Sequence, residues 1–268
     1  MFLPGLSAVR RPGHFQVFMM PEIITPVKVN GAVEKRMTAA QPYGHSMARL
    51  LNDLYGRERV SRLVVVMRHS ARRYAEHPAG EPFMELTEEG KDMAYAWGRA
   101  LPLGAPVSFF SSFIGRCIET AYLIDKGHVA AGGRTRHPVI ERTLSPYYVR
   151  NASRFLEVCK TFSDFFGQWF AGRISPDIID PPSDIARQMN VFWNRRLDNT
   201  LDDTGKTVDI CVTHDWNLFV AREYLLGLAH DAHGDVAYLD GVIVFEEDRK
   251  RYIVSPDSTP VALDASQG

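Results

Sequence analysis

The feature that most constrains the fold is the apolar run Val64-Val65-Val66-Met67, which stops abruptly at Arg68-His69 and is followed by Arg72 and Arg73. A continuous β-branched run without alternating polar residues is typical of a strand buried on both faces of a mainly parallel sheet. Open α/β sheets bind their ligands at the carboxyl ends of the strands. The cationic cluster at this strand end therefore predicts a binding site for an anion.

From residue 44 onward, strands and helices alternate, which predicts a doubly wound α/β fold with a mainly parallel sheet. We expect strands at 62–67, 107–110, around 139–140, 208–213, 241–246 and 252–254. We expect helices at 46–55, 87–101, 114–126, 153–170, 183–198 and 216–226.

The chain is predicted to form one domain with two additions. Residues 1–43 contain several prolines and no sustained hydrophobic period, which predicts an extended N-terminal arm, with a small hairpin around Asn30-Gly31 within it. Residues 44–268 are predicted to form a single domain. The helical stretch at about 150–205 interrupts the alternation and predicts a small helical cap inserted between sheet strands.

Composition limits the class of partner. A formal net charge of -1 gives no overall attraction to nucleic acid or to an acidic membrane surface. Cys117, Cys159 and Cys211 lie far apart and lack the spacing of a zinc or redox site, which favours reduced core cysteines in a cytosolic protein. No stretch approaches the ~20 apolar residues of a membrane helix. We expect a soluble, cytoplasmic protein.

Three of the expected strands end in polar groups that could share one pocket. Arg68-His69 and Arg72 follow the first strand, Ser111-Ser112 leads to Arg116, and His214-Asp215 follows a later strand. Because parallel strands end at the same edge of a sheet, we expect these residues to converge. Neither a lone Arg-His pair nor an Asp that caps a helix would predict catalysis by itself.

The combination suits phosphoryl transfer, which needs cationic donors around the phosphate oxygens and an in-line nucleophile. Arginine provides a permanently charged planar fork, and a neutral imidazole can attack phosphorus to give a phosphohistidine. His69 is the predicted nucleophile, and His214 is predicted to donate a hydrogen bond to the developing charge. A carboxylic acid must protonate the leaving oxygen, and Asp215 and Glu141 are both candidates.

The segments RHSARR (68–73), SSFIGRCIETA (111–121) and THDWN (213–217) resemble the motifs of the histidine phosphatase superfamily, whose fold is also called phosphoglycerate-mutase-like. LTEEGKDMAYAWGRAL (86–101) is similar to the helix that follows the first motif, so the resemblance spans roughly residues 62–254. It implies a three-layer α/β/α sandwich and a phosphorylated His69. It also implies a phosphate pocket formed by Arg68, Arg72, Arg116 and His214, with Asn217 in a substrate-binding role.

The resemblance leaves the general acid open. HDWN is similar to the HDxN pattern of the acid phosphatase and phytase branch, in which the aspartate protonates the leaving group, and this favours Asp215. In the mutase-like branch a glutamate near the position of Glu141 has this role. The family's usual glycine after the nucleophile is Ser70 here, where a β-carbon could restrict φ or crowd the substrate.

We therefore expect a phosphatase that acts on a small phosphorylated substrate without a metal cofactor and can form a homodimer. A phosphoglycerate-mutase-like phosphoryl transferase and an inactive phospholigand-binding module are the alternatives. The segment from His230 to Asp235 has no third ligand at helical spacing, so we expect a solvated loop there rather than a metal site.

Overall fold

The computed structural model describes residues 43–76, 78–198 and 205–263. The predicted N-terminal arm at 1–43, with its hairpin, therefore lies outside the described residues except for Tyr43. The described residues contain one sheet with the strand order β3-β2-β4-β1-β5-β6-β7. Its strands are β1 (Val60–Arg68), β2 (Val107–Ser111), β3 (Thr135–Ile140), β4 (Thr207–Thr213), β5 (Gly241–Glu247), β6 (Lys250–Val254) and β7 (Val261–Ala262).

The four strands β3, β2, β4 and β1 are parallel to one another, whereas β5, β6 and β7 extend the sheet as antiparallel strands. In the register of the parallel part, Arg68 pairs with Thr213 and Ser111 pairs with Val212. The last residues of three strands therefore lie next to one another at one edge of the sheet.

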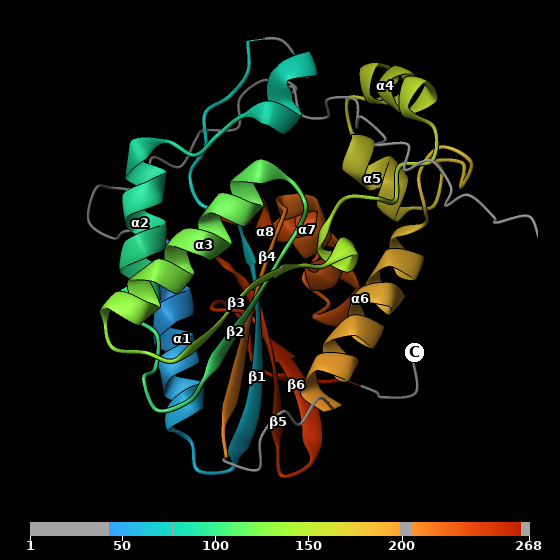
Figure 1. Cartoon of the computed structure of the whole chain (residues 1–268). Coiled ribbons are helices and arrows are strands. Elements are labelled where there is room, and N and C mark those ends of the chain that lie inside the picture. The colour runs from blue at the N-terminus through green and yellow to red at the C-terminus, as the bar shows by residue number, and fades with distance from the viewer. Residues whose placement is uncertain (1–42, 77, 199–204, 264–268) are drawn as a thin grey trace, which may run out of the picture.

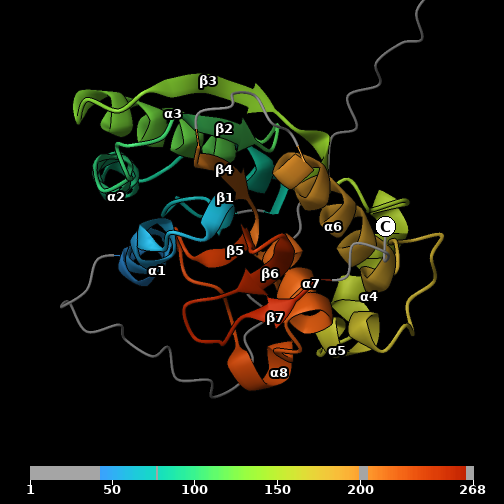
Figure 2. The same ribbon diagram turned by 90° about the horizontal axis from the view of Figure 1, so that it is seen from below.

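Helices cover both faces of the sheet, as Figures 1 and 2 show. The helices on one face are α1 (His45–Gly56), α2 (Glu88–Arg99) and α3 (Gly115–Ala130), and those on the other are α6 (Pro182–Asp198) and α7 (Asp215–Leu225). Val64 and Val66 pack into the core on the α6 and α7 face, whereas Val65 and Met67 pack into the core on the opposite face. Because β1 is buried on both sides, it needs the unbroken apolar run seen in the sequence. The predicted α/β fold is confirmed.

The segment expected to form the helical cap divides into two parts. The helices α4 (Ala152–Thr161) and α5 (Phe165–Phe170) lie beyond the carboxyl ends of the parallel strands, whereas α6 packs on the sheet beside α7 (Figure 1). The prediction of a single helix at 153–170 is wrong. Phe162 takes an extended conformation with φ -101° and ψ 117°, and Asp164 starts a new helix by accepting a hydrogen bond from the Gly167 amide at 3.0 Å.

The start of α2 is fixed closely against the segment that follows β1. Thr87 is its N-cap, as predicted, and accepts a hydrogen bond from the Gly90 amide at 3.0 Å. A β-carbon at Gly90 would lie 2.1 Å from the carbonyl oxygen of Ala71. Glycine is therefore required at this crossing, which holds residues 70–72 in place.

The remaining elements are short. They are the 3₁₀ helices η1 (Pro78–Phe83) and η2 (Arg142–Leu144) and the helix α8 (His230–His233). Among the residues that the structure describes, no helix is both long and apolar enough to cross a membrane.

Candidate active site

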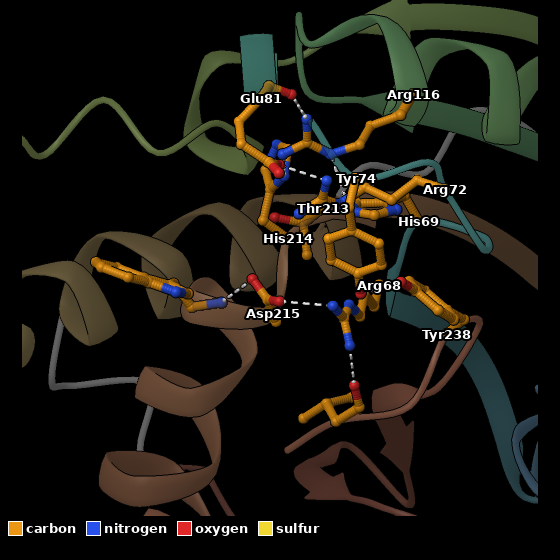
Figure 3. Close-up of polar contacts among 12 residues, drawn as sticks. Arg68, His69, Arg72, Tyr74, Glu81, Arg116, Thr213, His214, Asp215 and Tyr238 are labelled. Carbon is orange, nitrogen blue, oxygen red and sulfur yellow. Dashed lines mark hydrogen bonds and ion pairs between the residues drawn. The ribbon is translucent and has the colours of Figure 1, made fainter. Parts of the chain in front are cut away.

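The three predicted strand ends converge on one pocket at the carboxyl edge of the sheet. The His69 amide donates a hydrogen bond to the Thr213 carbonyl at 3.0 Å, and the Ser112 amide donates one to the Val212 carbonyl at 3.1 Å. These bonds continue the β1–β4 and β2–β4 ladders by one residue past the strands. Figure 3 shows His69, Arg116 and His214 facing one another across this edge.

His69 is only 2% exposed, and its hydrogen bonds define its tautomer. Its Nδ1 lies 2.8 Å from the carbonyl oxygen of Ser70, which can only accept, so Nδ1 carries the proton. Its Nε2 accepts a hydrogen bond from Nε of Arg116 at 3.0 Å. Nε2 is therefore the nitrogen with the lone pair, and it points toward a guanidinium group.

The charge state of His69 agrees with this geometry. Burial is the main reason that the pKa of His69 lies well below its ordinary value, and the nearby Arg116, His214 and Arg68 side chains lower it further. The ring is consequently neutral at physiological pH, which keeps the lone pair on Nε2 available.

His214 is the second buried histidine, and it lies at the N-cap of α7. Its Nε2 lies 2.9 Å from the hydroxyl of Ser112, and its Nδ1 lies 3.4 Å from Nη2 of Arg116. The His69 and His214 ring centroids are 5.7 Å apart. Burial is again the main reason that the pKa of His214 lies well below its ordinary value, with Arg116 and Arg68 adding to the effect.

Each of the three predicted arginines lies in the pocket, and each is held by oxygen atoms of the protein. Arg68 forms an ion pair with Asp215 at 2.8 Å and donates to the Val236 carbonyl at 2.6 Å. Arg72 forms a buried ion pair with the carboxylate of Glu81. The backbone carbonyl of Glu81 also accepts a hydrogen bond from Nη1 of Arg116 at 3.2 Å.

Glu81 is a pocket residue that the sequence analysis missed. It lies in η1 within a loop rich in Pro and Gly, and its side chain is 7% exposed. Its Oε1 also accepts a hydrogen bond from the Ala75 amide at 3.2 Å, which ties the loop to itself. Nothing in the local pattern distinguishes it from a solvated loop acid, because its partners Arg72 and Arg116 come from other elements.

The two candidate acids occupy different surroundings. Asp215 accepts a hydrogen bond from the Trp216 amide through Oδ1 at 3.0 Å and contacts Arg68 through Oδ2. Glu141 caps η2, and its Oε1 accepts hydrogen bonds at 3.0 Å from the amide and the hydroxyl of Thr143. Within the described part of the chain, Asp215 thus joins the arginine cluster, whereas the carboxylate of Glu141 forms no hydrogen bond or ion pair with it.

Asn217, predicted to bind substrate, is not brought to the arginines. Its Oδ1 accepts from the Tyr148 hydroxyl at 3.0 Å, and its Nδ2 donates to the Thr143 carbonyl at 3.5 Å. Both ends of the side-chain amide are therefore used to join α7 to the segment after β3. Asn217 is 1% exposed, and its role in substrate binding stays a prediction.

Ser70, the unusual residue after the nucleophile, fits its position. Its hydroxyl donates to the Gly90 carbonyl at 2.6 Å, and its amide donates to the Thr120 hydroxyl at 3.1 Å. The φ of Ser70 is not positive; in the described parts of the chain, the non-glycine residues with positive φ are Leu239, Asp248 and Arg249. The side chain of Ser70 points toward α2 and its φ is not positive, so the β-carbon does not strain the backbone.

The segment from His230 to Asp235 differs from the expected solvated loop. Residues 230–233 form α8, and the His230 ring packs against Phe219 with a centroid distance of 4.3 Å. The aromatic cluster of α5 and α7 provides this apolar surface, which periodicity alone does not reveal. In the described residues, no group of three or more His, Cys, Asp or Glu side chains is arranged to hold a metal ion.

Comparisons with known proteins point to one family. A protein-family model described as the histidine phosphatase superfamily (branch 1) matches residues 64–241. No curated protein matches the chain.

Solved structures with a similar arrangement have low sequence identity to the chain. One is described as mycobacterial hydrolase 1, with 16% identity, coverage of 74% of this chain and 100% of that chain, and a TM-score of 0.49. Another is a phosphoserine phosphatase mutant from Entamoeba histolytica in complex with phosphoserine, with 15% identity, coverage of 72% and 95%, and a TM-score of 0.46. A third is a phosphoglycerate mutase from Bacillus anthracis, with 16% identity, coverage of 74% and 95%, and a TM-score of 0.45.

Proposed function

Because the chain belongs to the histidine phosphatase superfamily, as the motifs predicted, we propose that it hydrolyses a phosphate monoester through a phosphohistidine at His69. The observation that carries this proposal is the orientation of His69. Its Nδ1 proton is bound by the Ser70 carbonyl at 2.8 Å, which leaves the lone pair of Nε2 facing Arg116 at 3.0 Å. A neutral imidazole nitrogen beside a guanidinium group is suited to attack a bound phosphoryl group.

In the first step, Nε2 of His69 forms a bond to phosphorus while the bond from phosphorus to the leaving oxygen breaks. Arg68, Arg72 and Arg116 would bind the nonbridging oxygens. His214 would donate a hydrogen bond to the charge that develops there once its Nδ1, which faces Nη2 of Arg116 at 3.4 Å, carries a proton. Arg68 now contacts Asp215, and Arg72 contacts Glu81. Phosphate oxygens would therefore replace these carboxylates as partners of the two arginines.

The leaving oxygen takes a proton from a carboxylic acid in the same step. In the second step, a water molecule gives a proton to that carboxylate, and the oxygen of the water bonds to phosphorus. The bond between Nε2 of His69 and phosphorus breaks at the same time, which releases free phosphate. We favour Asp215, since it follows His214 directly and contacts Arg68 at 2.8 Å. The HDWN sequence is similar to the HDxN pattern of the acid phosphatase and phytase branch, whereas the matched family model is that of branch 1. The preference for Asp215 therefore depends on its contact with Arg68.

The assignment of the acid is tested by comparing Asp215→Asn with Glu141→Gln. An alkyl phosphate needs a proton on its leaving oxygen, whereas p-nitrophenyl phosphate needs little help. We expect Asp215→Asn to lose alkyl phosphate turnover selectively, while Glu141→Gln affects both substrates alike. The reverse pattern would assign the role to Glu141.

The proposed reaction is tested with His69→Ala and the exposed control His45→Ala. We expect His69→Ala to abolish both release of free phosphate and acid-labile labelling of the protein by substrate phosphate. The control should retain both. Transfer of phosphate to a second position of the substrate, without release, would instead indicate a mutase. If the purified protein binds orthovanadate but hydrolyses no phosphomonoester, the result would indicate a phospholigand-binding module.

The wider setting is also part of the proposal. We infer a small phosphorylated substrate, because the site described above recognises a phosphoryl group through a few buried cationic side chains. A cytoplasmic location is supported by the three cysteines, which are all unpaired. Cell fractionation tests the location, and light scattering of the purified protein tests the expected homodimer.

A further inference from the structure

Two tyrosines from separate loops meet beside the nucleophile. Tyr74 follows β1 and Tyr238 precedes β5, and their hydroxyl oxygens lie 2.6 Å apart. Figure 3 shows Arg116 and His214 on one side of His69, with Tyr74 and Tyr238 on the other. The reaction proposed above assigns neither tyrosine a role.

Each tyrosine ring also packs against one of the phosphate-site arginines. The Cζ atom of Arg68 lies 4.4 Å from the ring centroid of Tyr238, and that of Arg72 lies 4.3 Å from the ring centroid of Tyr74. The rings of Tyr238 and His69 have a centroid distance of 5.9 Å. The tyrosine pair therefore spans from Arg68 to Arg72 along the side of His69.

The backbone holds Tyr238 firmly in this position. The next residue, Leu239, is fully buried and has a φ of 57°, a left-handed conformation that is unfavourable for leucine. Its amide donates to the Arg68 carbonyl at 3.2 Å, and the Arg68 amide donates to the Asp240 carbonyl at 2.8 Å. Packing and hydrogen bonds thus maintain a strained turn that directs Tyr238 onto Arg68.

The hydroxyl pair can also recognise a polar group. Burial, followed by the hydrogen bond to Tyr74, raises the pKa of Tyr238, so its hydroxyl keeps its proton at neutral pH. Two hydroxyls that share one hydrogen bond leave one further O–H free to donate. The pair is therefore both a steric barrier and a hydrogen-bond donor.

The surroundings of His69 leave little room for a leaving group. His69 is 2% exposed and Arg72 is 4% exposed, whereas Tyr74 is 57% exposed and forms the outer part of the pair. We propose that Tyr74 and Tyr238 are specificity-determining residues that admit phosphate esters with a compact, polar leaving group and exclude those with bulk beside the ester oxygen. This inference rests on the proposed hydrolysis at His69, since it concerns the substrates of that reaction.

The test compares two aryl esters that differ in bulk beside the ester oxygen, phenyl phosphate and 1-naphthyl phosphate. We expect the wild type to prefer phenyl phosphate, and Tyr74→Ala to raise the ratio of kcat/KM for the naphthyl to the phenyl ester by about tenfold or more. Tyr74→Phe and Tyr238→Phe keep the rings but remove the hydrogen bond, and should raise the ratio about fivefold, as expected for one neutral hydrogen bond. A purely structural role would lower kcat/KM for both esters equally and leave the ratio unchanged, which would overturn the inference.

The matched control is Tyr122→Phe. Tyr122 is 50% exposed and its ring centroid lies 5.2 Å from Nζ of Lys126, so it is also a surface tyrosine packed against a cation. It lies on α3 outside the pocket. The control should leave the ratio unchanged, and an equal effect in this variant would overturn the inference.

A second readout does not depend on turnover. Calorimetry with phenylphosphonate and 1-naphthylphosphonate measures how binding responds to bulk in ligands whose bond between carbon and phosphorus is not cleaved by this reaction. We expect the wild type to bind the phenyl compound at least about tenfold more tightly, and Tyr74→Ala to remove most of this difference. A preserved difference in Tyr74→Ala would overturn the inference. Absence of turnover together with the expected change in binding would overturn the hydrolysis and retain the role of the tyrosines in selecting ligands.

Discussion

The substitution Glu81→Gln tests whether the buried carboxylate of Glu81 occupies the place of a phosphate oxygen on Arg72. Their side chains are 7% and 2% exposed, so solvent screens the ion pair little. Removing one partner of a buried ion pair typically costs about 3–5 kcal/mol. Glutamine keeps the size of the side chain and one oxygen, which can accept from Arg72 or from the Ala75 amide but not from both, because these donors contact different oxygens of Glu81. We expect a loss of about 3 kcal/mol of unfolding free energy. That corresponds to a fall in Tm of roughly 6–12 °C for a domain of this size.

The variant should also respond more strongly to an anion. In the wild type, a bound anion must displace the Glu81 carboxylate from Arg72, whereas in Glu81→Gln it meets a guanidinium group that lacks a charged partner. Ligand stabilisation increases as the dissociation constant falls. We therefore expect orthovanadate to bind Glu81→Gln more tightly and to recover most of the lost Tm.

Thermal unfolding with and without orthovanadate, together with calorimetric titration, measures both effects. The control is Glu88→Gln, since Glu88 forms an ion pair with Lys91 at 2.8 Å but its side chain is 79% exposed. We expect the control to leave the Tm and the vanadate affinity unchanged. A wild-type Tm in Glu81→Gln would refute the energetic role of the pair, and weaker vanadate binding would refute the competition between Glu81 and phosphate.

Three further predictions concern other parts of the pocket. Because the pKa values of His69 and His214 are held below their ordinary values, the unfolded chain takes up protons before the native state does. The stability that these neutral rings contribute is complete above about pH 6.5 and is lost as the pH falls below that value. The acid limb of the pH profile of kcat/KM should likewise lie below about pH 6.5. An acid limb above that value would contradict a neutral His69. Ser70→Ala removes the hydrogen bond to Gly90, so we expect a loss of about 1 kcal/mol in chemical denaturation with kcat unchanged. Arg116→Lys replaces a fork that contacts both histidines with a point charge, and steady-state kinetics should show kcat lower by about 100-fold.

The parts of the site that the sequence predicted share one property. Arg68, His69, Arg116 and His214 each lie within a few residues of the end of a parallel strand. The strands themselves are recognisable because they are short segments rich in β-branched and aromatic residues. Strand order need not be known for such a prediction, because all parallel strands finish at the same edge. The convergence of these residues could therefore be predicted from local patterns.

Other features depend on individual hydrogen bonds that the hydrophobic pattern of the sequence does not show. The helix expected at 153–170 is interrupted because Asp164 bonds to the Gly167 amide, and aromatic periodicity does not reveal this cap. Asn217 follows the HDxN pattern, yet its side chain bonds to Tyr148 and Thr143 from another part of the chain. Motif membership predicted the position of Asn217 but not the direction of its hydrogen bonds.

Glu81, which the sequence analysis missed, balances positive charges that the sequence analysis did identify. Arg68, Arg72 and Arg116 repel one another when they are brought together in a buried site, so their closeness requires compensating oxygen atoms. Asp215 and Glu81 provide the carboxylates, one adjacent in sequence to a motif histidine and the other within a loop. A buried arginine cluster read from sequence should therefore prompt a search for internal carboxylates in every loop that can reach it. In the proposed reaction, a phosphate group would compete with these carboxylates for the same guanidinium hydrogens.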